Sequence, residues 1–150
     1  QALHWFDLEA FFAEVDRVLA PGGLLAVWSY GVQHIDDGHI DAIIQDFYNN
    51  VIGPWWPPER RMVEAGYAGI ALPWTPLASP DFPMSARWGI DELIGYFGSW
   101  SAVRRYRDGT GEDPLPALAA RLRPLWGRPD ARVTITWPLI MRVTRKPGAD

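Results

Sequence analysis

The histidines are the residues of this sequence best suited to proton transfer near neutral pH, because unperturbed imidazole changes its charge in that range. His4 lies between a leucine and a tryptophan, just before a periodic apolar segment. It could act as a general base or line a binding pocket. The alternative is a capping or surface histidine, which is the more common role of a histidine with no other catalytic residue near it in the sequence.

A second group of residues could ligate a metal ion: His34, Asp36, Asp37, His39 and Asp41. Imidazole and carboxylate ligands suit several divalent cations. The same composition is typical of a solvated loop before a helix, and we favour that interpretation. We therefore assign no metal ligand.

Several classes of chemistry are excluded by missing residues or patterns. Without cysteine there is no disulfide, thiolate zinc site or cysteine nucleophile. Ser99 and Ser101 lack the G-x-S-x-G pattern of a hydrolase. Gly22 and Gly23 follow a helical segment and do not match G-x-G-x-x-G, so they form no dinucleotide loop. A net charge of −4 without a basic run argues against nucleic acid or an anionic membrane as the main partner.

Length and composition predict a soluble globular protein. A chain of 150 residues suits one compact domain, so we expect residues 1–150 to form a single domain. No apolar run approaches the length of a membrane span and no signal segment opens the chain, so a cytoplasmic location is expected. Nine tryptophans are an unusual number, and by default they belong to a core or an interface.

The first predicted element is a helix from Asp7 to Leu19. Apolar residues recur there at the i, i+3, i+4, i+7 spacing, and Asp7 can cap the first turn. Pro21-Gly22-Gly23 ends the helix. The continuous apolar run at residues 24–30 predicts a strand covered on both faces in a parallel sheet. These elements form the second half of a βαβ unit, whose first strand would lie before Gln1, so we expect the chain to be part of something longer.

The rest of the chain mixes helices with two further strands. Amphipathic patterns predict helices at residues 40–51, 58–64, 91–97, 99–107 and 113–125. Ser99 is a candidate cap for one of them, and Gly109-Thr110-Gly111 is predicted to be a loop. Residues 72–83 are expected to be extended or irregular, and residues 82–88 are expected to form a short strand. Alternation over 133–144 predicts one long, half-buried final strand, antiparallel to its neighbours.

Five segments taken together resemble class I S-adenosylmethionine-dependent methyltransferases, and in particular the trans-aconitate methyltransferase-like branch. The segments are Gln1-Ala2-Leu3-His4-Trp5-Phe6-Asp7, the helix end and strand from Arg17 to Tyr30, Gly53 to Arg61, Ser99 to Ala102, and Trp137-Pro138-Leu139. The resemblance implies the C-terminal part of a Rossmann-like α/β fold with an antiparallel last strand and a helical insertion. Trp55 departs from the branch, where tyrosine is expected, and Ser99 departs from its commoner threonine.

The resemblance also implies S-adenosyl-L-methionine as the cofactor. In the family, a glycine-rich turn and an acidic residue bind most of it, and this sequence contains neither. The cofactor-binding residues implied here are Gln1, Ala2, Leu3 and Trp5, with His4 as the catalytic candidate. Aromatic faces suit a sulfonium because their negative quadrupole attracts a cation. A carboxylate acceptor would favour a guanidinium. The implied substrate-binding residues are Trp28, Tyr30, Trp55, Trp56, Arg60, Arg61 and Trp100, with Arg87 as a further choice.

These observations predict methyl transfer to a small-molecule acceptor, for which a carboxylate is a candidate. The chain would be part of a longer enzyme and is expected to be inactive alone. The alternative is a non-catalytic, aromatic-rich module that binds a ligand or a partner chain. An exposed sheet edge would also permit homo-oligomers.

Overall fold

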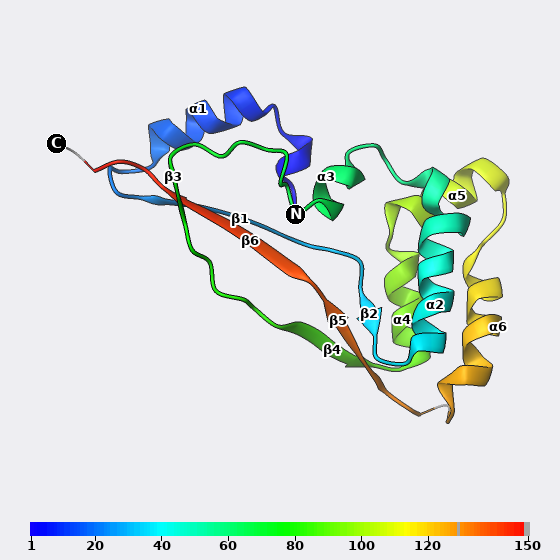
Figure 1. The fold of residues 1–150 in the computed structure, drawn as a ribbon. Helices are drawn as coiled ribbons and strands as arrows, with labels where there is room; N and C mark the ends of the chain where they lie inside the picture. The colour runs from blue at the N-terminus through cyan, green and yellow to red at the C-terminus, as the bar shows by residue number, and fades with distance from the viewer. Residues whose placement is uncertain (129, 149–150) are drawn as a thin grey trace. The chain divides into compact units, whose positions relative to one another are not determined.

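The computed structural model describes residues 1–128 and 130–148, and their contacts divide the chain into two compact units. Unit 1 comprises Gln1–Val32, Pro58–Met84 and Trp137–Asp150. Unit 2 comprises Gln33–Pro57 and Ser85–Thr136. Each unit is therefore built from segments that are far apart in the sequence, as the colours of Figure 1 show.

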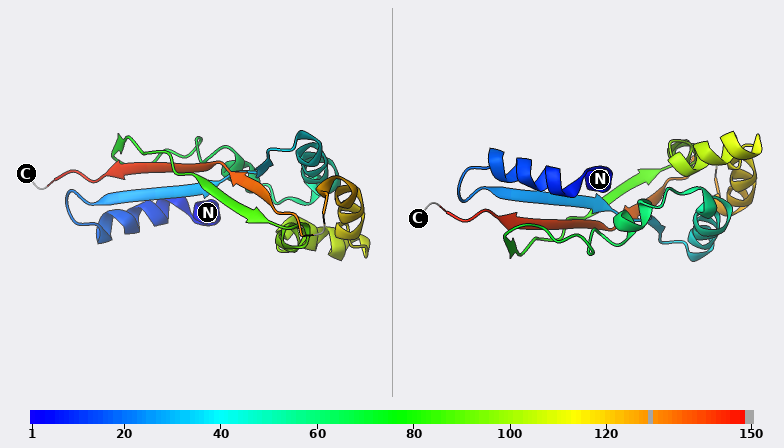
Figure 2. Two further views of the ribbon diagram at one scale, coloured as in Figure 1. Left: turned by 90° about the horizontal axis from the view of Figure 1, so that it is seen from below. Right: turned by 90° about the horizontal axis from the view of Figure 1, so that it is seen from above.

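Unit 1 is a three-stranded antiparallel sheet with helices packed on it. The strands follow the order β1-β6-β3, with β1 at Leu24–Tyr30, β6 at Leu139–Arg145 and β3 at Thr75–Leu77. The register pairs Leu24 with Arg145 and Tyr30 with Leu139, and both views in Figure 2 show β1 and β6 side by side. Because β6 is antiparallel to both neighbours, β1 and β3 run parallel to each other.

The first helical elements of unit 1 follow directly from the local sequence. A short 3₁₀ helix, η1, spans Leu3–Trp5, and α1 spans Leu8–Val18. Asp7 caps α1 as predicted, since its carboxylate accepts a hydrogen bond from the Ala10 amide at 3.1 Å. Val15 is buried in the core of the unit, but Val18 is largely exposed, so the predicted apolar face of α1 is narrower than expected.

The prediction for β1 is wrong in one respect. Within the described residues, β1 pairs only with the antiparallel β6, and its side chains alternate between buried and exposed. Leu25 and Val27 enter the core, whereas Leu24 and Trp28 are half exposed. The continuous apolar run thus predicted the strand correctly. It could not show which face of the strand packs against other residues of this chain.

Among the described residues, β1 has no strand on the side away from β6, where only Gln1 bonds its last residues, and this edge leads to a prediction about association. We expect the 150-residue chain to self-associate at high concentration, because an apolar strand edge invites pairing. Sedimentation velocity over a concentration series measures this. Leu24→Lys places a charge on the exposed face of β1 and should shift the equilibrium toward the monomer. A monomeric wild-type chain throughout the series would contradict the prediction.

Unit 2 is rich in helices. Its two-residue strand β2 (His34–Ile35) pairs with β5 (Val133–Trp137) in a sheet of order β2-β5-β4, where β4 is Met84–Trp88. The helical elements are α2 (Gly38–Asp46), the π-helical turn η2 (Phe47–Val51), the 3₁₀ turn η3 (Gly53–Trp55), α4 (Ile90–Gly98), α5 (Ser101–Thr110) and α6 (Leu115–Trp126). Helices α2 and α4 both pack against α6, and the side chains buried in this unit include Ile44, Phe47, Leu93, Phe97 and Leu122.

Three predicted boundaries differ in the structure. Ser99 does not cap α5; its hydroxyl donates to the Tyr96 carbonyl at 2.6 Å, so it closes α4 instead. Gly109 and Thr110 belong to α5, and Gly111 with a φ of 76° ends it. The predicted long final strand is divided into β5 and β6 at Pro138, which has no N–H for a ladder hydrogen bond.

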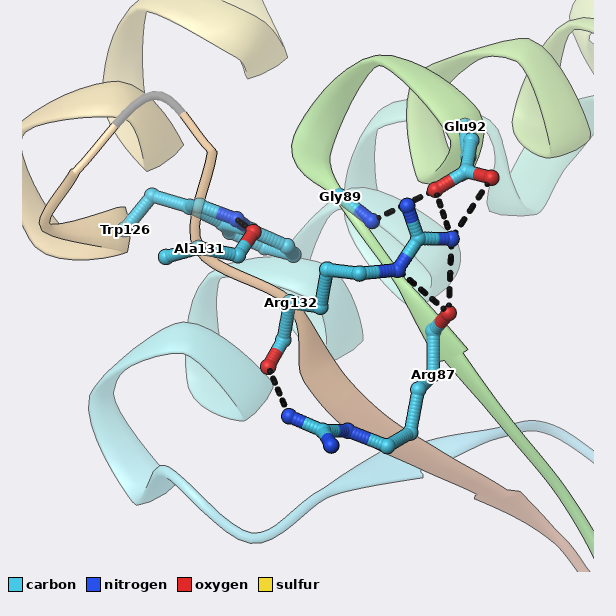
Figure 3. A network of polar contacts seen from close by, with 6 residues as sticks. All are labelled: Arg87, Gly89, Glu92, Trp126, Ala131 and Arg132. Carbon is cyan, nitrogen blue, oxygen red and sulfur yellow. Dashed lines mark hydrogen bonds and ion pairs between the residues drawn. The ribbon is translucent and has the colours of Figure 1, made fainter.

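An ion-pair network in unit 2 ties the start of α4 to the residues before β5 (Figure 3). The Arg132 guanidinium donates to the Arg87 carbonyl at 2.9 Å and to the Glu92 carboxylate at 2.8 Å. Glu92 also accepts a hydrogen bond from the Gly89 amide at 2.7 Å, which satisfies a free N–H of the first helical turn. That amide, followed by Arg132, lowers the pKa of Glu92 below its ordinary value of 4.5.

The lowered pKa of Glu92 predicts a pH-dependent stability. Since the folded state favours the ionised carboxylate, its contribution is present above pH 4.5 and is lost as pH falls through the folded-state pKa. Glu92→Gln should therefore lower the melting temperature at pH 7, and the difference from wild type should shrink at acid pH. Thermal melts across a pH series measure both. Glu112→Gln, at an exposed loop position, is the matched control, and an equal effect of the two variants would contradict the prediction.

Candidate active site

His4 and Tyr67 form the central contact of the candidate site, within unit 1. The buried Leu3 anchors η1, and the next residue, His4, lies with its Nδ1 2.9 Å from the Tyr67 hydroxyl oxygen. The His4 ring also packs at 4.6 Å against the ring of Trp5. Residues separated by 63 positions in the chain thus meet through a polar contact at the edge of the core.

The backbone that presents Tyr67 is unusual. Helix α3 (Arg60–Glu64) ends in a turn in which Gly66 and Tyr67 both have a φ of 57°. A side chain at Gly66 would collide with Ile140, because a Cβ there would lie 2.6 Å from the Ile140 Cδ1 atom. Tyrosine rarely adopts a left-handed backbone conformation. This conformation costs on the order of 1–2 kcal/mol, so it persists only where the surrounding structure holds it.

Arg142 on β6 provides part of that support. Its guanidinium donates hydrogen bonds to the carbonyls of Tyr67 and Ile70, the second at 2.7 Å. The Tyr67 amide in turn donates to the Met62 carbonyl at 2.8 Å. The left-handed turn is therefore held both from the sheet and from α3.

The surroundings favour the uncharged forms of both side chains. Burial lowers the pKa of His4 and the charge of Arg60 lowers it further, while Glu59 acts in the opposite direction. Burial raises the pKa of Tyr67, opposed by backbone hydrogen bonds from His4 and Leu3 and by the charge of Arg60. A neutral imidazole beside a neutral phenol is the state expected at pH 7.

The segment predicted to bind the cofactor lies beside β1. The Gln1 amino group donates to the Trp28 carbonyl at 3.1 Å, and the Gln1 side-chain oxygen accepts from the Tyr30 amide at 3.0 Å. Trp5 and Trp28 are 60% and 51% exposed, so each presents an open aromatic face. A hollow of about 250 Å³ lies here, lined mainly by apolar groups: Gln1, Ala2, Leu3, Phe6, Phe11, Leu25, Ala26, Val27 and Trp28. The structure thus groups Gln1, Ala2 and Leu3 with Trp28 and Tyr30, whereas Trp5 does not line this hollow and packs against His4 instead.

The two predicted arginines of α3 differ in their surroundings. Arg60 is mostly buried and approaches Glu64, with 3.6 Å between its Nε and the carboxylate. Arg61 is exposed and borders a second hollow, of about 430 Å³, together with Leu8, Met62, Ala65, Tyr67, Gly69 and Ile70. Of the two, Arg61 is the guanidinium placed to meet a ligand in that hollow.

The other predicted substrate residues belong to unit 2 and gather in an aromatic cluster. Trp56 packs at 5.1 Å from Tyr48 and at 5.5 Å from Trp100, measured between ring centroids. Trp55 packs against Tyr106 and lies so close to Gly109 that a Cβ there would come within 2.4 Å of the indole. These tryptophans fill space within unit 2, which is the default interpretation for such residues.

The acidic loop uses its carboxylates for local structure. Asp37 caps α2 through the His39 and Ile40 amides, and Asp41 accepts from the Ile35 amide at 3.0 Å. Across residues 1–128 and 130–148, no three histidine or acidic side chains are grouped so that they could hold a metal ion. No helix within the same ranges is long and apolar enough to cross a membrane.

The fold and this site define an α/β protein whose candidate site combines a neutral histidine, a buried tyrosine and exposed indole faces. No family model matches the chain. A solved structure from Anaeromyxobacter dehalogenans, described as a "putative Type II methyltransferase", is similar over 99% of this chain and 63% of that one, with 40% identity and a TM-score of 0.90. A Dictyostelium discoideum protein named a "putative methyltransferase" is 26% identical over 151 residues, which is 97% of this chain and 57% of that protein.

These relationships support a methyltransferase family and an α/β methyltransferase-like fold. The chain spans about three fifths of the length of each of these relatives.

Proposed function

We propose that this chain is part of an S-adenosylmethionine-dependent methyltransferase of the trans-aconitate methyltransferase-like branch, acting on a small-molecule acceptor. The observation that carries the proposal is the match of almost the whole chain to a methyltransferase structure at 40% identity. Both relatives are longer than this chain, which fits the expectation that further cofactor-binding strands belong to the complete enzyme.

The residues present suit one end of the cofactor. Trp28 lines the apolar hollow of unit 1 with an exposed indole face, and Trp5 offers a second exposed indole in the segment that follows Gln1, Ala2 and Leu3. Such faces attract a sulfonium cation. When bound, S-adenosylmethionine supplies an activated methyl group, so the protein has chiefly to align the acceptor and keep water away. Gln1, Ala2 and Leu3 would line the cofactor side of this hollow.

The acceptor is proposed to be a small carboxylate. Arg61 borders the 430 Å³ hollow that also reaches Tyr67, and a guanidinium binds a carboxylate through two parallel hydrogen bonds. His4 would face the reacting end of the acceptor, because its ring is fixed by Tyr67 on the same unit. Arg60 would act mainly by its charge, since its guanidinium already approaches Glu64.

A methyl-transfer assay on the complete enzyme tests the function. The enzyme is incubated with isotope-labelled S-adenosylmethionine and a panel of small acids, amines and phenols, and labelled products are separated by mass spectrometry. Methylation of carboxylates supports the proposal, and Arg61→Ala should then raise KM more than it lowers kcat. Methylation only of uncharged acceptors would contradict the carboxylate assignment, and tight ligand binding without any methylated product would favour a non-catalytic binding module.

Replacing Trp5 tests the cation–π interaction. We expect Trp5→Phe in the complete enzyme to weaken S-adenosylmethionine binding by about 1 kcal/mol, or roughly fivefold, because phenylalanine keeps an apolar ring but has a weaker π face. Affinity for an uncharged sulfur analogue of the cofactor should change less. Isothermal titration calorimetry measures both, and Trp74→Phe, at a half-buried position just before β3 in the same unit, is the control. Equal losses for the charged and uncharged ligands would point to a packing role for Trp5.

A further inference from the structure

The buried hydroxyl of Tyr67 has a hydrogen-bonding requirement that restricts the state of His4. Tyr67 is 2% exposed, and burying its O–H without a hydrogen-bond acceptor would cost folding free energy. Among the described residues, the acceptor within hydrogen-bond distance of this oxygen is His4 Nδ1, at 2.9 Å. Were Nδ1 protonated instead, the phenolic proton would have no acceptor among them.

The relative acidity of the two groups favours the same direction. A phenol ionises near pH 10, whereas a neutral imidazole N–H is a far weaker acid and its unprotonated nitrogen is a good acceptor. The Tyr67 hydroxyl is therefore the donor of this contact, and His4 Nδ1 is the acceptor.

We propose that Tyr67 holds His4 as the tautomer protonated at Nε2, so that His4 offers the methyl acceptor a hydrogen-bond donor instead of a proton acceptor. A neutral imidazole carries one proton, so a lone pair engaged at Nδ1 places that proton on Nε2. Among the described residues, the His4 ring makes its hydrogen bond at Nδ1, so Nε2 is left for a ligand. Tyr67 is thus a positioning residue, and the ligand group that His4 fits is an oxygen with a free lone pair, such as a carboxylate or carbonyl oxygen.

The surrounding residues fix the relative positions of His4 and Tyr67. Gly66 permits the left-handed turn, Arg142 fixes the Tyr67 carbonyl, and the buried Leu3 fixes the start of η1. Burial is the largest cause that lowers the pKa of His4; among the charged side chains, Arg60 lowers it and Glu59 raises it. The net effect lowers the pKa of His4, so the neutral tautomer is the relevant form at pH 7.

The tautomer can be measured without any activity. The 150-residue chain is labelled with ¹⁵N-histidine, and long-range ¹H–¹⁵N correlation spectra are recorded above the pH at which the histidines titrate. We expect His4 to be a single species with a protonated Nε2 and an unprotonated Nδ1, and Tyr67→Phe to return it to a mixture. His34 and His39, in unit 2, are internal references that should not change. A protonated Nδ1 in the wild type, or a His4 tautomer unchanged by Tyr67→Phe, would overturn the proposal.

The consequence for the acceptor rests on the proposed function and is tested in the complete enzyme. His4→Gln keeps an N–H donor near the position of Nε2 but cannot accept a proton at neutral pH, whereas His4→Ala removes both. If His4 donates, His4→Gln should retain kcat/KM within roughly threefold and His4→Ala should lose roughly tenfold, the scale of one hydrogen bond. If both variants lose 10²–10⁴-fold, the range of general-base catalysis, the donor role is wrong. A wild-type enzyme that methylates nothing would refute the proposed function and leave the spectroscopic result on the tautomer intact.

Discussion

S-adenosylmethionine is expected to bind the 150-residue chain at least roughly a hundredfold more weakly than it binds the complete enzyme. The sequence holds no G-x-G turn after a strand, and in the family it resembles that turn and an acidic residue provide directional contacts to the cofactor. Losing about three hydrogen bonds of about 1 kcal/mol each corresponds to two orders of magnitude in affinity. What remains in this chain is the apolar hollow beside Trp28.

Isothermal titration calorimetry on both proteins measures this difference. S-adenosylhomocysteine is a useful second ligand, because it lacks the sulfonium charge and should show the same loss if the missing contacts lie on the adenosine side. Low-micromolar binding of S-adenosylmethionine to the 150-residue chain would show that the chain itself holds the principal cofactor contacts. The proposal that residues outside this chain supply them would then be wrong.

The second large effect concerns the core of unit 2. Phe97→Ala should lower the free energy of unfolding by about 3–5 kcal/mol, the range for truncating a buried phenylalanine. Phe97 is fully buried, and its ring centroid lies 4.6 Å from that of Trp100 and 6.0 Å from that of Phe47. The cavity left by the ring would remove packing from α4 and also from the tryptophan cluster, whose Trp100 rests on it.

Chemical denaturation of wild type and variant measures the effect, with a drop of roughly 10 °C expected in thermal melts. Phe82→Ala is the matched control, since Phe82 is 45% exposed and should cost less than about 1 kcal/mol. Near-equal effects of the two substitutions would mean that Phe97 is not part of a well-packed core.

Local signals in the sequence predicted the elements whose formation depends on neighbouring residues. The Asp7 cap and the apolar period predicted α1 to within a residue at each end, and the continuous apolar run predicted the bounds of β1. The final strand was predicted as one element because alternation continues across Pro138. The structure divides it there, where the Pro138 carbonyl accepts a hydrogen bond from Gly31 at 2.9 Å. That contact joins residues more than 100 positions apart, and no local pattern reports it.

The sequence predicted one of the two central residues of the candidate site. His4 was identified from its motif, but Tyr67 was not, because its partner lies 63 residues away and tyrosine gives no signal for a left-handed backbone. The one available sign was the glycine before it, at Gly66, and a single glycine is compatible with many turns. The grouping of Trp28 and Tyr30 with Gln1 was expected only through the family resemblance, and the contacts of Gln1 with β1 account for it physically.

The pairing of β1 with β6 determines when unit 1 can form. The two strands come from opposite ends of the chain, so each rung of the ladder joins residues separated by more than 100 positions. A growing polypeptide is made at about 5–20 residues per second, so β1 leaves the ribosome several seconds before its partner exists. Many contacts of unit 2 lie nearer in sequence, as in α4 against α6, and they can close first. Unit 1 is therefore expected to be the slow-folding part of the molecule, and the apolar residues of β1 the segment that most needs protection during synthesis.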